Sequence, residues 1–178
     1  YVKGNDIPQT PYNLDGLIFT PISIPYPNVG GRWEYLLKWK PPILNSIDFL
    51  VRVVKDGNKD KISYYNNGSK TFNYKSLNLY VGKTFEDRRT KKISYGPSPF
   101  VISIDGSEPT AQVANVQIDS MEKMYANDPL SNMREEIQDE TIVEFSYIAD
   151  ENRIFRWQPI RVRHDKTEKY KKTKSIGY

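Results

Sequence analysis

Residues 49–57 read FLVRVVKDG, an apolar stretch that alternates along its length and ends in an Asp-Gly pair. A period of two predicts a half-buried strand, and Asp56-Gly57 predicts the turn that follows it. Further short runs of this kind continue along the chain, separated by turn signals such as Asn67-Gly68 and Asp105-Gly106. Many short strands joined by such turns favour a small β-barrel after residue 46, for which the OB fold is the natural candidate.

The fold class expected from this pattern is mostly β (α+β), an OB-fold barrel with one helical insert. Residues 121–138 are the one stretch expected to be helical, interrupted or begun at Asp128-Pro129. Residues 166–178 are basic and weakly patterned, and we expect a linker or a frayed end. The expected strands are residues 14–20, 35–39, 49–55, 61–65, 73–81, 92–95, 100–104, 113–118, 141–148 and 153–163.

Composition excludes several classes of protein. The 178 residues suit one ordinary domain or two small pieces, and 38% hydrophobic with 13% aromatic residues rule out wholesale disorder. The absence of cysteine excludes disulfides, thiolate zinc sites and a cysteine nucleophile. The single histidine, His164, is interpreted as structural or incidental. No apolar run approaches the roughly 18 residues that cross a bilayer, so no membrane partner is expected.

The first residues lack a basic start and an apolar stretch, so no signal peptide is expected. Together with the missing cysteines, this favours a reducing compartment such as the cytosol. The sequence does not begin with methionine, and we expect a fragment.

Charge is divided into three blocks around a net charge of +4. Residues 1–104 carry fifteen Lys/Arg against eight Asp/Glu, residues 105–152 two against twelve, and residues 153–178 nine against two. Two basic blocks around an acidic insert indicate local phosphate sites rather than a uniform coating for nucleic acid.

Residues 15–19, DGLIF, place an acid and a glycine before a buried strand. Asp15 there could hold a divalent metal at the edge of a cleft, although an Asp-Gly pair is more often only a turn. Residues 36–41, LLKWKP, put Lys38 and Lys40 on one face of a strand. Two ammonium groups so placed suit a phosphate; the alternative is a solvated edge strand.

Residues 157–166, WQPIRVRHDK, put Arg161 and Arg163 on one strand face, with Asp165 in the same parity. Asp165 could hold a guanidinium in place, and Lys166 adds a further cation. A basic edge strand is the alternative. The acidic run at 134–140 is interpreted as a solvated helix end.

In this order and spacing, three stretches resemble the mRNA capping guanylyltransferases, which are covalent nucleotidyltransferases related to DNA and RNA ligases. DGLIFTP (15–21) resembles the fourth motif of that superfamily, LLKWKPP (36–42) with NSIDF (45–49) the fifth, and RWQPIRVRHDKT (156–167) the sixth. The sequence of residues 142–178 is most similar to the capping enzymes of large cytoplasmic DNA viruses. In those enzymes a cap methyltransferase domain follows the guanylyltransferase. Residues 56–135 match only as a plausible barrel.

The resemblance implies transfer of GMP from GTP, through a lysyl-GMP adduct, to the 5′ diphosphate end of RNA. By analogy Asp15 helps position Mg²⁺ or Mn²⁺, and Lys38 and Lys40 contact the α-phosphate. Arg161, Arg163, Asp165 and Lys166 would lie on an OB-fold lid that closes over the nucleotide and orients the pyrophosphate. Expected domains are 1–46 (end of the nucleotidyltransferase domain), 47–168 (OB-fold lid) and 169–178 (basic tail or linker).

One departure from the family concerns the nucleophile, which lies in a Lys-x-Asp-Gly motif that these 178 residues do not contain. We therefore expect an inactive fragment that depends on an upstream part of the enzyme, located in the cytoplasm (a viral factory or a virion, if viral). Alternative functions are an ATP-dependent nucleic-acid ligase fragment, a non-catalytic OB-fold module for single-stranded nucleic acid, and a scaffold docking through residues 105–152.

Overall fold

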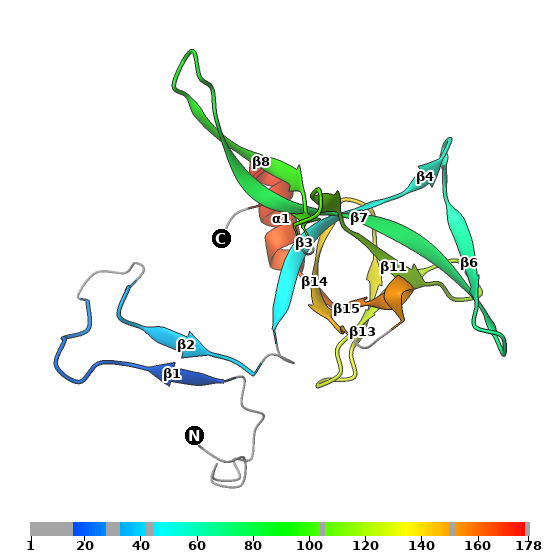
Figure 1. Cartoon of the computed structure of the whole chain (residues 1–178), viewed down its shortest axis with the longest axis horizontal. Helices are drawn as coiled ribbons and strands as arrows, with labels where there is room; N and C mark the ends of the chain where they lie inside the picture. Colours follow the sequence, from blue (N-terminus) through cyan, green and yellow to red (C-terminus); the bar gives the residue numbers. More distant parts are fainter. Residues whose placement is uncertain (1–15, 28–32, 42–44, 104–105, 150–151, 177–178) are drawn as a thin grey trace, which may run out of the picture. The chain divides into compact units, whose positions relative to one another are not determined.

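The computed structural model describes residues 16–27, 33–41, 45–103, 106–149 and 152–176. The chain divides into two compact units, Tyr1–Asn45 and Ser46–Tyr178 (Figure 1). The second unit holds a curled sheet and a helix, so the prediction of a mostly β protein is confirmed, and the curled sheet is consistent with the expected OB-like domain. No helix in the described part of the chain is long and apolar enough to cross a membrane.

The first unit contains a short antiparallel pair, β1 (Leu17–Phe19) and β2 (Leu37–Trp39). These are the strands expected around residues 14–20 and 35–39, although each is shorter. Gly16, just before β1, has φ +149°, and a Cβ on it would lie 2.1 Å from the carbonyl oxygen of Trp39. Only glycine permits this close approach of the two backbones, so the Asp-Gly pair has a structural role at its second residue.

The sheet of the second unit is organised along β7, a strand of 16 residues. The order of its main path is β11-β7-β3-β14-β15, with β6 and β8 also paired to β7, all antiparallel. Successive segments of β7 pair with different strands, which lets the sheet curl. The seven strands are β3 (Ser46–Val53), β6 (Ile62–Asn66), β7 (Thr71–Glu86), β8 (Ile93–Pro99), β11 (Val113–Gln117), β14 (Thr141–Tyr147) and β15 (Trp157–Val162).

Three two-stranded pairs and two helical segments complete the described part of this unit. They are β4 (Lys55–Asp56) with β5 (Lys59–Asp60), β9 (Val101–Ile102) with β10 (Thr110–Ala111), β12 (Met124–Asn127) with β13 (Arg134–Ile137), the 3₁₀ turn η2 (Arg153–Phe155) and α1 (His164–Thr173).

The main core fills the concave side of the curled sheet. Phe49 is fully buried and its ring packs against Phe100, Phe145 and Trp157, with centroid distances of 4.9, 5.9 and 5.2 Å. Alternate residues of β3, β7 and β14 join this cluster. The period-two apolar pattern of residues 49–55 therefore has the expected cause, since one face of the strand lies in the core.

Helix α1 covers the other face of the sheet, against β3 and β14. Tyr170 from the helix is buried with Leu50 and Ile142 from the two strands. The Thr167 hydroxyl oxygen accepts a hydrogen bond of 2.9 Å from the amide of Ile142. This second, smaller cluster fixes the helix that follows β15 and so fixes the residues at their junction.

The expected helix at 121–138 is wrong, and so is the helix end expected at 134–140. That stretch forms the β12–β13 hairpin, in which Met124 and Ala126 are buried two residues apart, a strand period. Asp128 closes its turn by accepting backbone hydrogen bonds. The linker or frayed end expected at 166–178 is also wrong through residue 173, because α1 forms there. Tyr170 is the one large apolar side chain that α1 buries. A single buried ring is not the apolar stripe that predicts an amphipathic helix.

Candidate phosphate site

The candidate site of the second unit is a row of charged side chains across three neighbouring strands. The central strand β14 pairs with β3 on one side and with β15 on the other. In register, Glu144 lies opposite Asp48 of β3 and opposite Arg161 of β15. Residues directly opposite each other point to the same face of a sheet, so the sheet brings these three side chains together.

Close contacts connect this row. Arg161 Nη2 donates to Glu144 Oε2 at 2.7 Å, and the Ser46 hydroxyl donates to Glu144 Oε1 at 2.5 Å. Arg163 Nη1 donates to both oxygens of Asp48, at 3.2 and 3.1 Å, and lies 3.6 Å from Glu144 Oε2. Segments more than one hundred residues apart in sequence therefore meet at one place.

The start of α1 adds two more charged groups. Lys166 donates to Asp48 Oδ2, and Asp165 Oδ1 lies 3.5 Å from Arg163 Nε. The pairing of Asp165 with a guanidinium, expected from parity, is thus present, but Arg163 itself stands at the junction of β15 and α1 rather than within the strand. The contact with Asp48 holds Arg163 more closely than the exposed Asp165 does.

The cluster balances its own charge: Arg161, Arg163 and Lys166 face Asp48, Glu144 and Asp165. Burial acts to raise the pKa of Glu144, but the hydrogen bond from Ser46 and the contact with Arg161 outweigh it, and the pKa falls below its usual value. The hydrogen bond to Glu144 raises the pKa of Arg161. Glu144 and Arg161 are therefore both ionised at neutral pH and hold each other in place.

A pocket of about 310 Å³ opens beside this cluster. Asp48 and Lys166 line it, together with Ser46, Gly82 and Ile176. An ammonium carries three donors, a guanidinium carries five, and only some of them are used in the contacts above. Lys166 is the cation that lines this pocket, so a phosphate there could accept the remaining donors of its ammonium while Asp48 keeps it in place.

The other predicted site residues lie in the first unit. Lys38 belongs to β2, opposite Ile18 of β1, and Lys40 follows the strand; both are exposed. Asp15, the predicted metal ligand, lies outside the described residues. The predicted site residues thus belong to two different units of the chain.

Sequence reasoning missed the carboxylates that organise the cluster, Asp48 and Glu144. Asp48 stands within the NSIDF stretch, and no role was assigned to it. Glu144 is the single acid between the buried Val143 and Phe145. The Glu144 side chain therefore faces away from the core. A single acid at such a strand position is the feature of the sequence that could have indicated an ion pair on the outer face of the sheet. His164, predicted to be incidental, places Nε2 3.1 Å from Glu135 Oε1 on the surface.

The fold and this cluster define a β-rich, OB-like domain that presents the Lys166 ammonium at the edge of a pocket, beside two paired arginines. The chain is homologous to mRNA-capping enzymes. It is 37% identical over 174 residues, 92% of its length, to the probable mRNA-capping enzyme of Acanthamoeba polyphaga mimivirus. It is also 38% identical over 95 residues (49% of its length) to the mRNA-capping enzyme subunit alpha of Candida glabrata, and 43% identical over 56 residues (32%) to the mouse mRNA-capping enzyme.

The chain spans only part of these relatives: 13% of the mimivirus protein, 20% of the Candida glabrata subunit and 9% of the mouse enzyme. No protein-family model matches the chain. No solved structure matches it either.

Proposed function

We propose that this chain is the C-terminal part of an mRNA guanylyltransferase, with GTP and the 5′ diphosphate end of RNA as substrates. The observation that carries the proposal is the meeting of the fifth-motif and sixth-motif stretches at Asp48, where Arg163 and Lys166 both bind. The homology to capping enzymes supports the same assignment.

The proposed first step forms the lysyl-GMP adduct. A lysine amine attacks the α-phosphorus of GTP, a P–N bond forms, and the P–O bond to pyrophosphate breaks. Lys38 and Lys40 would offset negative charge that develops on the α-phosphate. Arg161, Arg163 and Lys166, held by the carboxylates of the cluster, would orient the leaving pyrophosphate. Asp165 would act as a positioning residue for Arg163.

In the proposed second step, a terminal β-phosphate oxygen of the RNA attacks the same phosphorus. The P–N bond breaks, GMP passes to the RNA, and the lysine is free again. An OB-fold lid that closes on GTP would bring the second unit to the nucleotide for the first step and withdraw for the second. The cluster has no net charge of its own. The electrostatic attraction that closes the lid would therefore come mainly from a triphosphate bound by another part of the enzyme.

The nucleophile in this proposal belongs to an upstream part of the nucleotidyltransferase domain. The β1–β2 pair supports such a partner, because its apolar side chains are exposed: Ile18 by 64%, Leu37 by 64% and Trp39 by 51%. Two three-residue strands that bury so little are not stable by themselves, and further strands would cover them. A cap methyltransferase domain and a cytoplasmic location, in a viral factory or virion, remain part of the proposal.

The metal in this proposal is Mg²⁺ or Mn²⁺, with Asp15 as its candidate ligand. Within the described residues, no group of three or more acidic or histidine side chains is arranged to hold a metal ion. The described site therefore does not fit a resident metal, and no step above depends on one.

The test is adduct formation in the enzyme that joins this chain to its upstream part, incubated with labelled GTP. Arg163→Ala should lower the rate of adduct formation by about 100-fold, as expected for loss of one preorganised donor. Arg52→Ala is the matched control, since Arg52 also forms an ion pair, with Glu140, away from the cluster. Wild-type adduct formation in Arg163→Ala would refute the assignment, and a preference for ATP over GTP would favour a ligase instead.

A further inference from the structure

A long hairpin extends from the sheet where β7 and β8 pair beyond the core. Residues 83–95 form this arm, and their pairing continues from Lys83–Gly96 to Glu86–Ile93 (Figure 1). From Gly82 to Glu86 the arm is about 13 Å long at 3.3 Å per residue. Its side chains are largely exposed, so the arm adds little to the core, and the stability of the domain does not explain it.

The tip of the arm is an ordered turn. The Asp87 carboxylate accepts hydrogen bonds of 2.8 Å from the amides of Arg89 and Thr90. These hydrogen bonds lower the pKa of Asp87, so its carboxylate stays ionised. That carboxylate is bound to the amides of its own turn. Lys91 closes the turn with φ +57° and reaches Glu86 at 3.3 Å. Both acids of the arm are thus committed to the arm's own structure.

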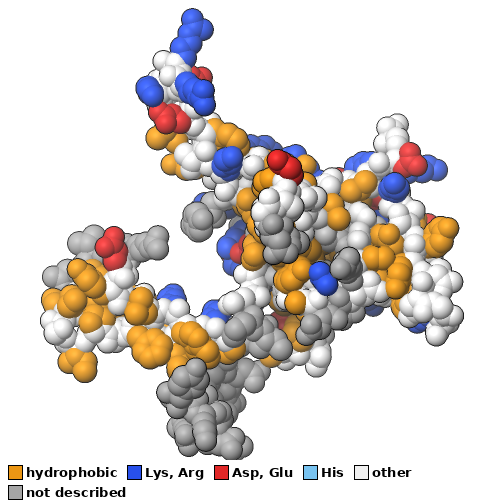
Figure 2. All heavy atoms as spheres, viewed as in Figure 1, with side chains coloured by type: hydrophobic (Ala, Val, Ile, Leu, Met, Phe, Trp, Pro, Cys, Tyr) orange, Lys and Arg blue, Asp and Glu red, His pale blue; other side chains and the backbone are white. Residues whose placement is uncertain are grey.

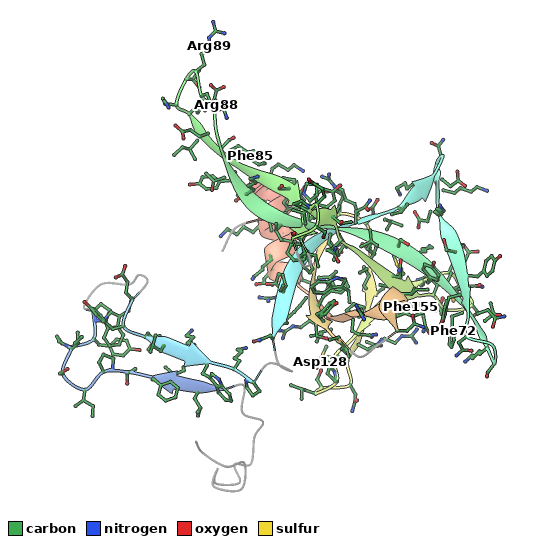
Figure 3. The ribbon with its side chains drawn as sticks, viewed as in Figure 1. Phe72, Phe85, Arg88, Arg89, Asp128 and Phe155 are labelled. Carbon is green, nitrogen blue, oxygen red and sulfur yellow. The ribbon has the colours of Figure 1, made fainter. Side chains whose placement is uncertain are left out.

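The cations of the arm outnumber these acids, five Lys/Arg against two. Figure 2 shows the blue side chains gathered at the tip, and Figure 3 shows Arg88 and Arg89 projecting from it. In the described part of the chain, neither of these guanidinium groups has an ion-pair partner. Exposed, unpaired guanidinium groups on a projecting hairpin suit a polyanion.

Exposed aromatic rings accompany the charges. Phe85 is 43% exposed and lies under the Lys83 ammonium at 6.0 Å, and Tyr95 is 64% exposed on the opposite face. Cations interleaved with exposed rings are the combination that binds single-stranded nucleic acid, in which rings stack on bases and cations contact phosphates.

The base of the arm is continuous with the candidate phosphate site. A pocket of about 340 Å³ is lined by Tyr95, Lys83 and Lys169. It shares Gly82 and Ile176 with the pocket that Asp48 and Lys166 line. A chain leaving the phosphate site could therefore pass Lys169 and Tyr95 and reach the tip of the arm.

We propose that the arm and the pocket at its base bind the single-stranded RNA that follows the 5′ end being capped. This proposal rests on the proposed function, because it takes RNA as the substrate at the neighbouring site. Arg88 and Arg89 contact phosphates and Tyr95 stacks on a base, so this binding is independent of the RNA sequence. The arm binds RNA that is several nucleotides long and has no part in binding GTP.

The experiment measures binding of a 5′-diphosphate oligoribonucleotide of about ten nucleotides, within the range that one OB fold covers. The 178-residue chain is titrated between 50 and 200 mM salt. Each phosphate contact on a single strand contributes about 0.7 to the slope of log K against log salt, so Arg88→Ala/Arg89→Ala should reduce that slope by about 1.4. Over this salt range the wild type should lose about 7-fold more affinity than the double variant.

The matched control is Lys59→Ala/Lys61→Ala, which removes two charges at the β4–β5 hairpin. Both side chains are exposed there, as the arginines of the arm are. The control should keep the wild-type slope. Tyr95→Ala should weaken binding by about tenfold with an unchanged slope, since stacking is not ionic.

Equal losses in the arm variant and the control would overturn the proposal, because the effect would then be one of net charge. Wild-type RNA binding by the arm variant, with loss of binding to a polyglutamate peptide, would overturn it in favour of an acidic protein partner. Adduct formation with GTP, measured in the enzyme that joins this chain to its upstream part, separates this proposal from the proposed function. Adduct formation should be unchanged in the arm variant. Failure of the proposed guanylylation would therefore appear in the adduct assay, and failure of the proposed RNA binding in the RNA titration.

Discussion

Glu144→Gln tests whether the carboxylate at the centre of the charged row holds the sheet and the cations together. The Glu144 side chain is 15% exposed and accepts hydrogen bonds from Ser46 at 2.5 Å and from Arg161 at 2.7 Å. Glutamine keeps the shape but has no charge, and it has one acceptor oxygen in place of two.

The magnitude follows from these two contacts. A hydrogen bond to a charged group contributes about 1.5–3 kcal/mol, and a neutral one about 0.5–1.5 kcal/mol, so each contact loses about 1 kcal/mol. The half-exposed Arg161 is partly screened, which leaves about 1.5 kcal/mol for the substitution. For a unit of this size we expect a fall in Tm of about 6 °C at pH 7.

The assay is thermal unfolding, followed by circular dichroism, as a function of pH. Because the pKa of Glu144 is lowered in the folded chain, its charge stabilises the fold above the unfolded value and ceases to do so as pH falls through the folded value. The difference between wild type and Glu144→Gln should therefore shrink below the usual glutamate pKa of 4.5.

The control is Glu140→Gln, the same change at a pair in which Glu140 is 46% exposed and lies 2.6 Å from Arg52. An exposed pair contributes roughly 0.5 kcal/mol, so this variant should remain close to wild type. Equal stability of the two variants at pH 7, or a gap for Glu144→Gln that persists in acid, would refute the reasoning.

Three further predictions concern packing. Phe49→Ala empties the centre of the main core and should cost about 3–5 kcal/mol in denaturant unfolding; a cost under about 1 kcal/mol would contradict the core described above. Thr167→Val leaves the Ile142 amide without its acceptor and should cost about 1–3 kcal/mol, with faster hydrogen exchange at that amide; unchanged exchange would count against it. Gly82→Ala places a Cβ 2.0 Å from a backbone oxygen of the segment after α1 and should speed tryptic cleavage there, while Gly96→Ala, with its nearest contact at 3.6 Å, should not.

The strands were predictable where one face of the chain meets the core. In residues 49–55 and 141–148 every second residue lies in the main core, and local pattern is sufficient for such strands. Leu50 and Ile142, on the other face, are buried as well because α1 covers them. The β12–β13 hairpin was missed because only three of its residues, Met124, Ala126 and Ile137, are buried, among many charged residues, which resembles a solvated helix. Helix α1 was missed because Tyr170 and Thr167, rather than an apolar stripe, attach it to the sheet.

The candidate site was predictable as a set of cations and not as an arrangement. Parity along residues 157–166 indicated that Arg161, Arg163 and Asp165 act together, and the motif order indicated phosphate chemistry. The sequence could not show which carboxylates hold these cations. Asp48 and Glu144 are about one hundred residues apart in the chain and become neighbours only through strand pairing.

The sequence by itself determined the mostly β class, the turns and the kinship with capping enzymes, since these depend on residue type and short-range order. The tertiary structure decided which distant charges meet, where the one described α-helix packs, and that a basic, aromatic arm continues from the candidate phosphate site. The physical reason is that strand register and packing set distances between side chains that no local pattern encodes.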